Sequence, residues 1–268
     1  NQKEQRHAQH IKNYESQQKE IAKLEDYVQR NIVRASTSKM AKSRRKALER
    51  MDVIEKPQES PNPTFLFSMK PVIGKTLMTA ENLIVGYTQQ LLPEIEFSIN
   101  VGQRLAITGF NGIGKSTLLK TICGIIPCLG GKISLSDKTI ISYYEQDNIF
   151  NNFQLSPIEE IREIYPLMEQ KLIRSSLGRC GLRGDQAMQS LSTLSGGEQA
   201  KVKICKLMLS PCNLLVLDEP TNHLDTKAVN RLKVAMEQFE GGILFVSHSK
   251  QFVEEVATDI LDLEKLFD

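Results

Sequence analysis

Apolar side chains recur at helical spacing over residues 3–55, a stretch without Pro or Gly that is dense in charged residues. Intervals of seven, three and four in the first set place its members on one helix face. That set is Tyr14, Ile21, Leu24 and Val28, and the second is Met40, Ala47, Leu48, Met51 and Ile54. Ser and Thr at 36–38 are suited to cap the second helix. Residues 1–56 are therefore expected to form an antiparallel α-helical hairpin.

A change of pattern follows the hairpin. Three prolines between residues 57 and 63 stop the helix, so residues 57–75 are expected to be a linker. Strands are expected at 77–87, 95–107, 131–136, 139–144, 214–218 and 243–247, and helices at 116–122, 157–190, after 197, at 226–239 and from 250. This alternation predicts an α/β domain with a mainly parallel sheet over residues 76–268, in which 157–190 form a helical subdomain.

A glycine-rich turn joins the expected strand at 104–108 to the expected helix at 116–122. Residues 109–116 read Gly-Phe-Asn-Gly-Ile-Gly-Lys-Ser and match the phosphate-loop motif G-x-x-x-x-G-K-[ST]. The glycines let successive backbone N–H groups face one anion, and the helix N-terminus adds positive potential. The Lys115 ammonium can reach the outer phosphates, and the Ser116 hydroxyl can bind Mg²⁺. The sequence thus predicts binding of a nucleoside triphosphate.

Two carboxylates, Asp218 and Glu219, end the fully apolar run at 214–217. Beside a phosphate loop, Asp218 is placed to hold Mg²⁺ through water, and Glu219 to orient or deprotonate an attacking water. His248 ends another apolar run, where it can touch a γ-phosphate, and Gln146 follows a third, where it can sense Mg²⁺ or the water. Taken singly, each has an ordinary structural alternative, because buried strands and structural histidines are common.

A second glycine motif, Leu-Ser-Gly-Gly-Glu-Gln, occupies residues 194–199 immediately before a helix. It forms another N-terminal anion site, with the Ser195 hydroxyl as an added donor. A helix cap alone would explain the serine and one glycine but not the whole hexapeptide.

In this order, the motifs resemble those of the ATP-binding cassette (ABC) ATPases over residues from about 76 to 268. The resemblance implies a P-loop ABC fold with an antiparallel β subdomain, and ATP hydrolysis with ATP and Mg²⁺ as cofactors. ATP-binding positions would be Tyr87, Gly109, Asn111, Gly112, Gly114, Lys115, Ser116 and Thr117. Mg²⁺ would be bound by Ser116, Gln146 and Asp218, and the catalytic residues would be Glu219, His248 and Gln146. For Tyr87, stacking on adenine and an ordinary strand aromatic remain equally open.

The resemblance also assigns residues to the opposing half of a composite site. Two cassettes would sandwich two ATPs, each between one phosphate loop and the opposing signature. The signature would be Ser195, Gly196, Gly197, Glu198 and Gln199, and the D-loop would lie around Asp225. One departure is Ser249-Lys250, which stands where the family commonly has Asp-Arg and leaves the capping of the last helix open.

Residues 194–202 and 218–225 further resemble the ABC-F group. Its members have two cassettes on one polypeptide and no transmembrane domain, and they act on the ribosome. Residues 1–56 resemble the helical linker between those cassettes, whose basic tip contacts tRNA and rRNA. The tip residues would be Arg30, Arg34, Lys39, Lys42, Arg44, Arg45 and Lys46. The short tip resembles housekeeping members more than members that dislodge ribosome-targeting antibiotics.

The charge distribution bears on this resemblance. Residues 1–56 carry fourteen Lys and Arg against eight Asp and Glu, a net charge of +6. Because the whole chain has a net charge of +2, the other 212 residues sum to −4. No acidic residue occurs from 27 to 48, so contact with a phosphate backbone and a merely solvated face are both open. Few aromatic residues are interleaved, which favours backbone and shape contacts over base stacking.

Composition narrows the setting. No run approaches the ~20 apolar residues of a membrane span, and the polar start lacks both a signal peptide and Met, so the chain is expected to begin within a longer cytoplasmic protein. Five cysteines without C-x-x-C spacing indicate reduced thiols.

The expected partners are a second cassette, on the same polypeptide or in a homodimer, and the ribosome. Hydrolysis by the fragment alone should be weak. Two alternatives remain, the ATPase subunit of a membrane transporter and a module whose hairpin binds another protein. Asn222-His223-Leu224-Asp225 argues against the transporter reading, because transporters more often have a Ser-Ala-Leu-Asp-like string there.

Overall fold

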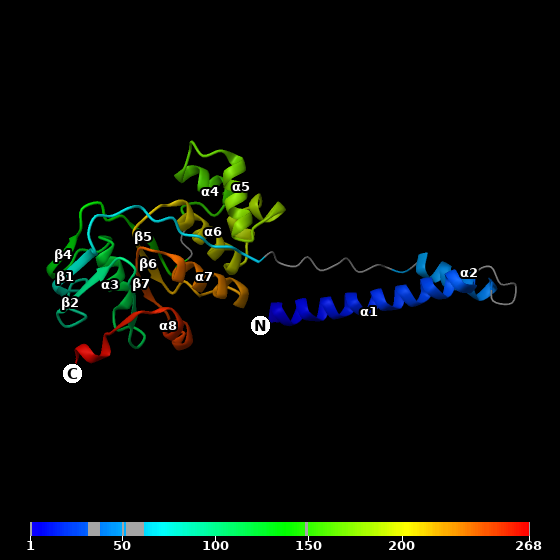
Figure 1. Ribbon diagram of the computed structural model, residues 1–268, viewed down its shortest axis with the longest axis horizontal. Helices are drawn as coiled ribbons and strands as arrows, with labels where there is room; N and C mark the ends of the chain where they lie inside the picture. The colour runs from blue at the N-terminus through cyan, green and yellow to red at the C-terminus, as the bar shows by residue number, and fades with distance from the viewer. Residues whose placement is uncertain (1, 32–37, 50, 52–61, 148–149, 268) are drawn as a thin grey trace. The chain divides into compact units, whose positions relative to one another are not determined.

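The computed structural model describes residues 2–31, 38–49, 51, 62–147 and 150–267. The chain divides into two compact units, residues 1–60 and 61–268, and each is described by itself. The first unit contains two helices, α1 (Gln2–Asn31) and α2 (Ser38–Glu49), which pack against each other (Figure 1). The second unit carries all the strands and the remaining helices.

The helix pair is held by the predicted face of α1 and by one aromatic contact. Tyr14, Ile21, Leu24 and Val28 are all partly buried. The Arg44 guanidinium of α2 lies 3.8 Å from the centroid of the Tyr27 ring of α1. The expectation that Met40 joins the apolar stripe is wrong, because its side chain is 57% exposed. Arg44 lies against Tyr27, and Met40 lies one turn nearer the start of α2. At that level α1 ends at Asn31, so α1 offers Met40 little to pack on. Ile54 lies outside the described residues.

Two sheets form the framework of the second unit. The antiparallel sheet has the order β2-β1-β4, with β1 (Thr76–Ile84), β2 (Ile95–Asn100) and β4 (Gly130–Leu135). The parallel sheet has the order β5-β6-β7-β3-β8, with β3 (Arg104–Thr108), β5 (Ile141–Tyr144), β6 (Leu214–Asp218), β7 (Gly242–Val246) and β8 (Asp259–Asp262). This is the predicted α/β class of the P-loop ABC ATPase fold.

The parallel sheet separates two apolar cores. Leu214 and Val216 of β6 point into one core, and Leu215 and Leu217 point into the other, as strand alternation requires. The first core contains α3 (Lys115–Ile122) and the antiparallel sheet. The second contains the remaining helices (Figure 1), which are α4 (Pro157–Ile164), α5 (Gln170–Arg179), α6 (Gly196–Leu209), α7 (Thr226–Gln238) and α8 (Lys250–Val256). A strand buried on both faces reads as one apolar run, which is why β6 was predicted with its observed bounds.

Three differences from the sequence prediction change the number or order of the elements. The expected strand at 95–107 is split into β2 and β3 by a turn at Gly102, whose φ of +76° favours glycine. The expected helical stretch at 157–190 is two helices followed by a 3₁₀ turn, Gly184–Ala187. The helix expected from residue 250 ends at Val256, and the short edge strand β8 follows it.

Asn213, fully buried immediately before β6, ties the preceding loop to the sheet. Its Oδ1 accepts from Ile140 N at 2.8 Å, and its Nδ2 donates to Lys138 O at 2.9 Å. Asn213→Ala is expected to lower the free energy of unfolding by about 1–3 kcal/mol, because both hydrogen bonds from the buried amide to the backbone of the preceding loop are lost. Thr76→Ala removes an exposed hydrogen bond to Asn100 and should cost less than about 0.5 kcal/mol. Urea unfolding followed by circular dichroism would compare them, and equal losses would contradict the prediction.

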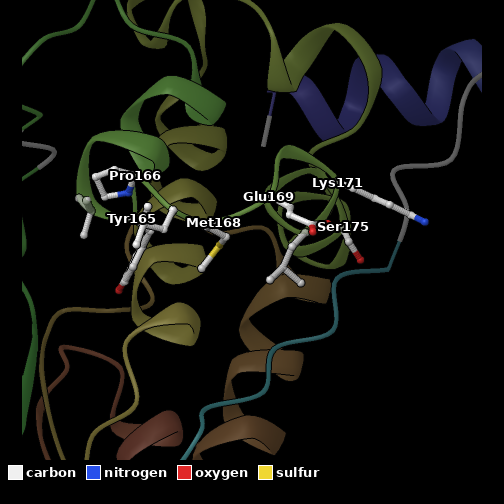
Figure 2. A pocket seen from close by; sticks show the side chains of 9 residues that line it. Tyr165, Pro166, Met168, Glu169, Lys171 and Ser175 are labelled. Atoms are coloured by element: carbon white, nitrogen blue, oxygen red, sulfur yellow. The ribbon is translucent and has the colours of Figure 1, made fainter.

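A surface hollow of about 870 Å³ opens beside the turn between α4 and α5 (Figure 2). Ile164, Leu167 and Leu172 line it and expose 46%, 100% and 52% of their surface. In the described part of the chain, no helix is both long and apolar enough to cross a membrane.

Candidate functional site

The parallel register brings the carboxyl ends of four strands to one edge. Val246 of β7 pairs with both Ile107 of β3 and Asp218 of β6, and Tyr144 of β5 pairs with Leu217. The phosphate loop, the Asp218–Glu219 pair, His248 and Gln146 all follow these strand ends, so they meet at this edge, where open α/β sheets bind ligands.

The phosphate loop has backbone angles that its sequence requires. Gly109, Gly112 and Gly114 have φ of +145°, +87° and +116°, a region that side chains rarely adopt. Lys115 begins α3 and is only 8% exposed. Its Nζ donates to Gly109 O at 2.7 Å and to Phe110 O at 3.0 Å, so the ammonium lies against the loop that would hold the phosphates.

The two carboxylates are deeply buried. Asp218 and Glu219 are 1% and 2% exposed, and burial raises the pKa of both. A hydrogen bond with Ser116 opposes this for the Asp218 pKa, and the His248 backbone does so for Glu219. No described residue hydrogen-bonds to Asp218 Oδ1, and the polar neighbour of Glu219 Oε1 is His248 Nε2 at 3.2 Å. Buried oxygens normally have a hydrogen-bond partner, so Asp218 Oδ1 is suited to a ligand or ion.

These residues fit Mg²⁺ in the manner of nucleotide sites. The Ser116 hydroxyl and the Asp218 carboxylate interact directly, and both are hard oxygen donors. Within the described ranges, no group of three or more His, Cys, Asp or Glu could hold a metal. Two protein oxygens suit Mg²⁺, which takes its other ligands from phosphates and water. Gln146 lies exposed just after β5, in reach of the same edge.

Glu219 is coupled to His248 across neighbouring strand ends. Its φ of +50° is uncommon for a side-chain-bearing residue and turns the chain sharply away from β6. Glu219 Oε2 accepts from His248 N at 3.0 Å, and Glu219 Oε1 lies 3.2 Å from His248 Nε2. The imidazole is 54% exposed, so it can face a ligand while its backbone holds the carboxylate.

Glu219→Gln is expected to raise the melting temperature at pH 7 when nucleotide and metal are absent. Because burial raises the folded-state pKa of Glu219, its favourable contribution exists at low pH and is lost as the carboxyl ionises. The neutral amide avoids that loss and can still accept from His248 N. A gain of about 2–4 °C corresponds to about 1 kcal/mol. Calorimetry should show a smaller gain at pH 5, and an equal or larger gain there would contradict the cause given.

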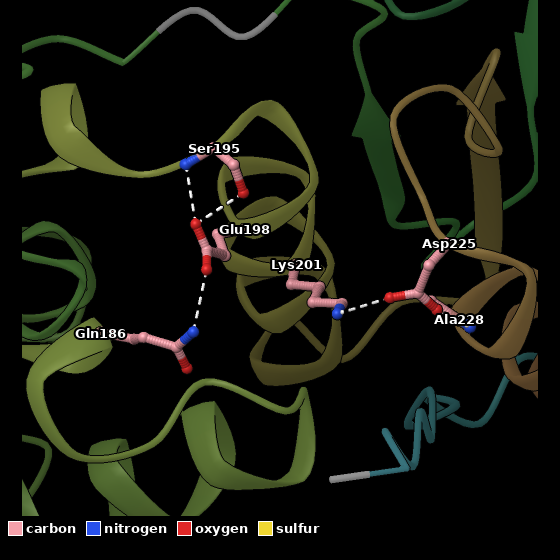
Figure 3. A network of polar contacts seen from close by, with 6 residues as sticks. All are labelled: Gln186, Ser195, Glu198, Lys201, Asp225 and Ala228. Atoms are coloured by element: carbon pink, nitrogen blue, oxygen red, sulfur yellow. Dashed lines mark hydrogen bonds and ion pairs between the residues drawn. The ribbon is translucent and has the colours of Figure 1, made fainter. Parts of the chain in front are cut away.

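The signature residues form a separate group at the start of α6 (Figure 3). Glu198 Oε2 accepts from Ser195 N at 2.7 Å and from Ser195 Oγ at 2.6 Å. Glu198 Oε1 accepts from Gln186 Nε2 at 2.8 Å. A Cβ on Gly197 would lie 2.6 Å from His223 O, so this position requires glycine. The Ser195 hydroxyl is thus available to a phosphate only if it leaves Glu198.

The D-loop is linked to the signature helix. Asp225 caps α7 by accepting from Ala228 N at 2.8 Å, and Lys201 of α6 donates to its Oδ2 at 3.1 Å (Figure 3). Lys201, which is only 8% exposed, was not predicted as part of the site. A lysine on the apolar side of a helix that contains Val202 and Ile204 is the signal that would have found it.

Two further sequence expectations concern single residues. Tyr87 follows β1 in a turn and is 64% exposed, so it is not an ordinary strand aromatic. Ser249 caps α8 by accepting from Phe252 N at 3.2 Å, so the open question about this cap is answered despite the departure from Asp-Arg.

A phosphate loop between β3 and α3, with a carboxylate at the end of β6, defines a P-loop NTPase. Family models described as "ABC transporter" match residues 92–222 and 1–67. The cassette belongs to the ABC ATPase domain family of ATP-hydrolysing P-loop NTPases.

Relatives and solved structures agree with this family. The ABC transporter ATP-binding protein YfmM of Bacillus subtilis (strain 168) is 42% identical over 94% of this chain and 48% of its own length. "ABC transporter F family member 2" of Arabidopsis thaliana is 33% identical over 93% of this chain and 38% of its own. The chain therefore spans less than half of each relative. A cassette dimer solved with ADP and phosphate has the same fold, with a TM-score of 0.60, 21% identity, and coverage of 70% of this chain and 94% of that one.

Proposed function

We propose that this chain is the linker hairpin and second ATP-binding cassette of a cytoplasmic ABC-F protein that acts on the ribosome. The observation that carries the proposal is a helical hairpin that precedes the cassette in the chain. Its residues 27–48 are basic and include no acidic residue. The F-family name of the Arabidopsis relative, which is similar over both units, supports the same branch.

The sheet edge suggests how ATP is held. The Lys115 ammonium exchanges Gly109 O and Phe110 O for the outer phosphate oxygens, while loop N–H groups contact the remaining ones. Ser116 would hold Mg²⁺ directly, Asp218 would do so through water, and Gln146 would complete the set. Bound Mg²⁺ neutralises charge on the phosphates. Tyr87 is placed to stack on adenine, and the N–H groups of 109–117 surround the phosphates.

Hydrolysis requires a base and an orienting group. Glu219 accepts a proton from water, because its buried carboxylate has a raised pKa and an oxygen, Oε1, that lies beside the half-exposed His248 imidazole. His248 faces the γ-phosphate, and its backbone holds Glu219 in place. The signature residues Ser195 to Gln199 close on the ATP of a second cassette, where the Ser195 hydroxyl leaves Glu198 for the γ-phosphate.

The hairpin supplies the contacts with tRNA and rRNA. The side chains of Arg30, Arg44, Arg45 and Lys46 are exposed. Lys39 and Lys42 lie on α2, and Arg34 lies outside the described residues. Asp26 pairs with Arg30 at 2.8 Å, and Arg44 stacks on Tyr27, so the two arginines are held in place before any RNA binds. Phosphate contact by such residues is electrostatic and sensitive to salt.

A second candidate is the ATPase subunit of a membrane transporter. The apolar hollow beside α4 and α5 favours it, because a fully exposed Leu167 suits contact with another protein. The basic hairpin has no role in this alternative, so the ribosomal proposal accounts for more of the chain.

Ribosome co-sedimentation separates the two candidates. The two-cassette polypeptide would carry Glu219→Gln and the matching change in its other cassette, with ATP at moderate salt. Neutralising Arg44, Arg45 and Lys46 to Gln should reduce retention about tenfold or more. The matched control neutralises Lys12, Lys19 and Lys23, three exposed lysines of α1 away from the tip, and should change little. Equal losses would contradict a specific tip contact, and the absence of ATP-dependent retention would favour the transporter.

A further inference from the structure

Lys203 of α6 reaches out of the signature helix to the segment that carries Gln146. Its Nζ donates to Glu145 O and, at 2.8 Å, to Asp147 O, the carbonyls on either side of Gln146. The same ammonium lies 4.2 Å from the centroid of the Tyr144 ring. Lys203 thus contacts three residues close to Gln146 in the chain, and Gln146 belongs to the candidate Mg²⁺ site.

A second lysine holds this segment from the other side. Lys120 of α3, the helix that follows the phosphate loop, pairs with Glu145 Oε1 at 2.7 Å. The backbone around Gln146 is therefore tied both to the phosphate-loop helix and to the signature helix. In the proposed function, α3 contacts the ATP of this cassette, and α6 contacts the ATP of a partner cassette.

Stability alone is a poor reason for an ammonium at this position. Burial lowers the pKa of Lys203 to about 8, although Glu145 and Asp147 attract its charge. An apolar side chain over Tyr144 would avoid this desolvation. An ammonium has what an apolar side chain lacks, donors that fix two carbonyl groups at once.

We propose that Lys203 is a positioning residue, which fixes Gln146 relative to the signature helix so that its amide meets Mg²⁺ at the phosphates. The inference rests on the proposed role of Gln146. Lys203 itself touches neither metal nor nucleotide, and acts only through the two carbonyls. A change in the position of α6 is passed through Lys203 to Gln146, and through Glu145 to the phosphate-loop helix.

The test is Mg²⁺-dependent binding of a fluorescent ATP analogue to the 268-residue chain. Lys203→Met should raise the Mg²⁺ concentration for half-saturation about tenfold, as lost support of a metal ligand typically does. Affinity in EDTA should stay within about twofold, because no phosphate contact is lost. Lys203→Arg should restore most of the Mg²⁺ response. If Lys203→Met fails to fold, Lys203→Gln keeps an N–H donor group on a shorter side chain and should give an intermediate shift.

Lys206→Met is the matched control. Lys206 lies on the same helix, pairs with Glu160 at 2.6 Å and lies 5.7 Å from the Phe150 ring centroid. This variant should lower the melting temperature without moving the Mg²⁺ midpoint. A Lys203→Met midpoint that moves no more than that of Lys206→Met would overturn the inference.

Gln146→Ala distinguishes the two levels of the proposal. If Gln146→Ala raises the Mg²⁺ midpoint and Lys203→Met does not, the positioning role is wrong and the proposed ATP site stands. If Gln146→Ala itself leaves the midpoint unchanged, the metal role of Gln146 is wrong, and the role of Lys203 fails with it.

Discussion

Glu219→Gln is expected to lower the ATP turnover of the two-cassette protein about 10²- to 10⁴-fold, the range for loss of a general base. Each oxygen of Glu219 has its own surroundings. Oε2 is held by the backbone N–H of His248, whereas Oε1 lies 3.2 Å from Nε2 of the half-exposed His248 imidazole. The amide keeps the shape and can still accept from His248 N, but it cannot take a proton from water.

The variant should still bind ATP, because Lys115 and the loop N–H groups are untouched. ATP affinity within about twofold of the parent protein is expected, together with ATP-bound protein that persists. Glu160→Gln is a matched control, since Glu160 is similarly buried, at 3% exposed, but pairs with Lys206 on α6. Phosphate release assays with both variants would decide. A turnover loss below tenfold for Glu219→Gln, or an equal loss for Glu160→Gln, would exclude Glu219 as the base.

The candidate site could be predicted because each of its motifs is local in sequence. A phosphate loop is one strand, one turn and one helix. β6 is recognisable in the sequence as an apolar run that leads into Asp218 and Glu219. Parallel strands then bring these ends together without further information, as the pairing of Val246 with both Ile107 and Asp218 shows. Patterning within single elements and one topological rule were enough.

The partners of the lysines of the signature helix could not be predicted in this way. Lys201, Lys203 and Lys206 lie close together in one helix, yet they reach α7, the segment after β5, and α4. Their partners are 24, 56 and 46 residues away, and two of the three pairs join residues that carry no motif. Which carbonyl or carboxylate a flexible lysine meets depends on tertiary packing, about which helical spacing gives no information.

The short edge strand β8 escaped prediction for a different reason. Its residues Asp259–Asp262 contain only two apolar side chains, and the strand forms because Leu105 to Thr108 of β3 offer a parallel edge to pair with. Four residues are too few for alternation to be distinguished from a loop. The exposure of Met40 has a related cause. An apolar residue of α2 is buried by α1 only where α1 extends beside it, and α1 ends at Asn31.

Lys115→Met is expected to weaken ATP binding about 100-fold, which corresponds to about 3 kcal/mol for a lost bond between an ammonium and phosphate oxygens. The Lys115 ammonium already lies between Gly109 O and Phe110 O, so little ordering is needed when phosphates replace these carbonyls. The methionine keeps the aliphatic packing but offers no donor. AMP should be affected least, because its single phosphate lacks the outer groups that the ammonium reaches.

Lys201→Met separates this effect from the general consequences of removing a buried charge. Lys201 is 8% exposed, as Lys115 is, but its ammonium bonds Asp225 beside the signature helix. Calorimetric titration should show its ATP affinity within about twofold of the parent chain, even though it unfolds at lower temperature. If both variants lose affinity equally, the loss reflects disturbed packing. If only Lys115→Met loses it, and more for ATP than for AMP, the ammonium acts on the outer phosphates.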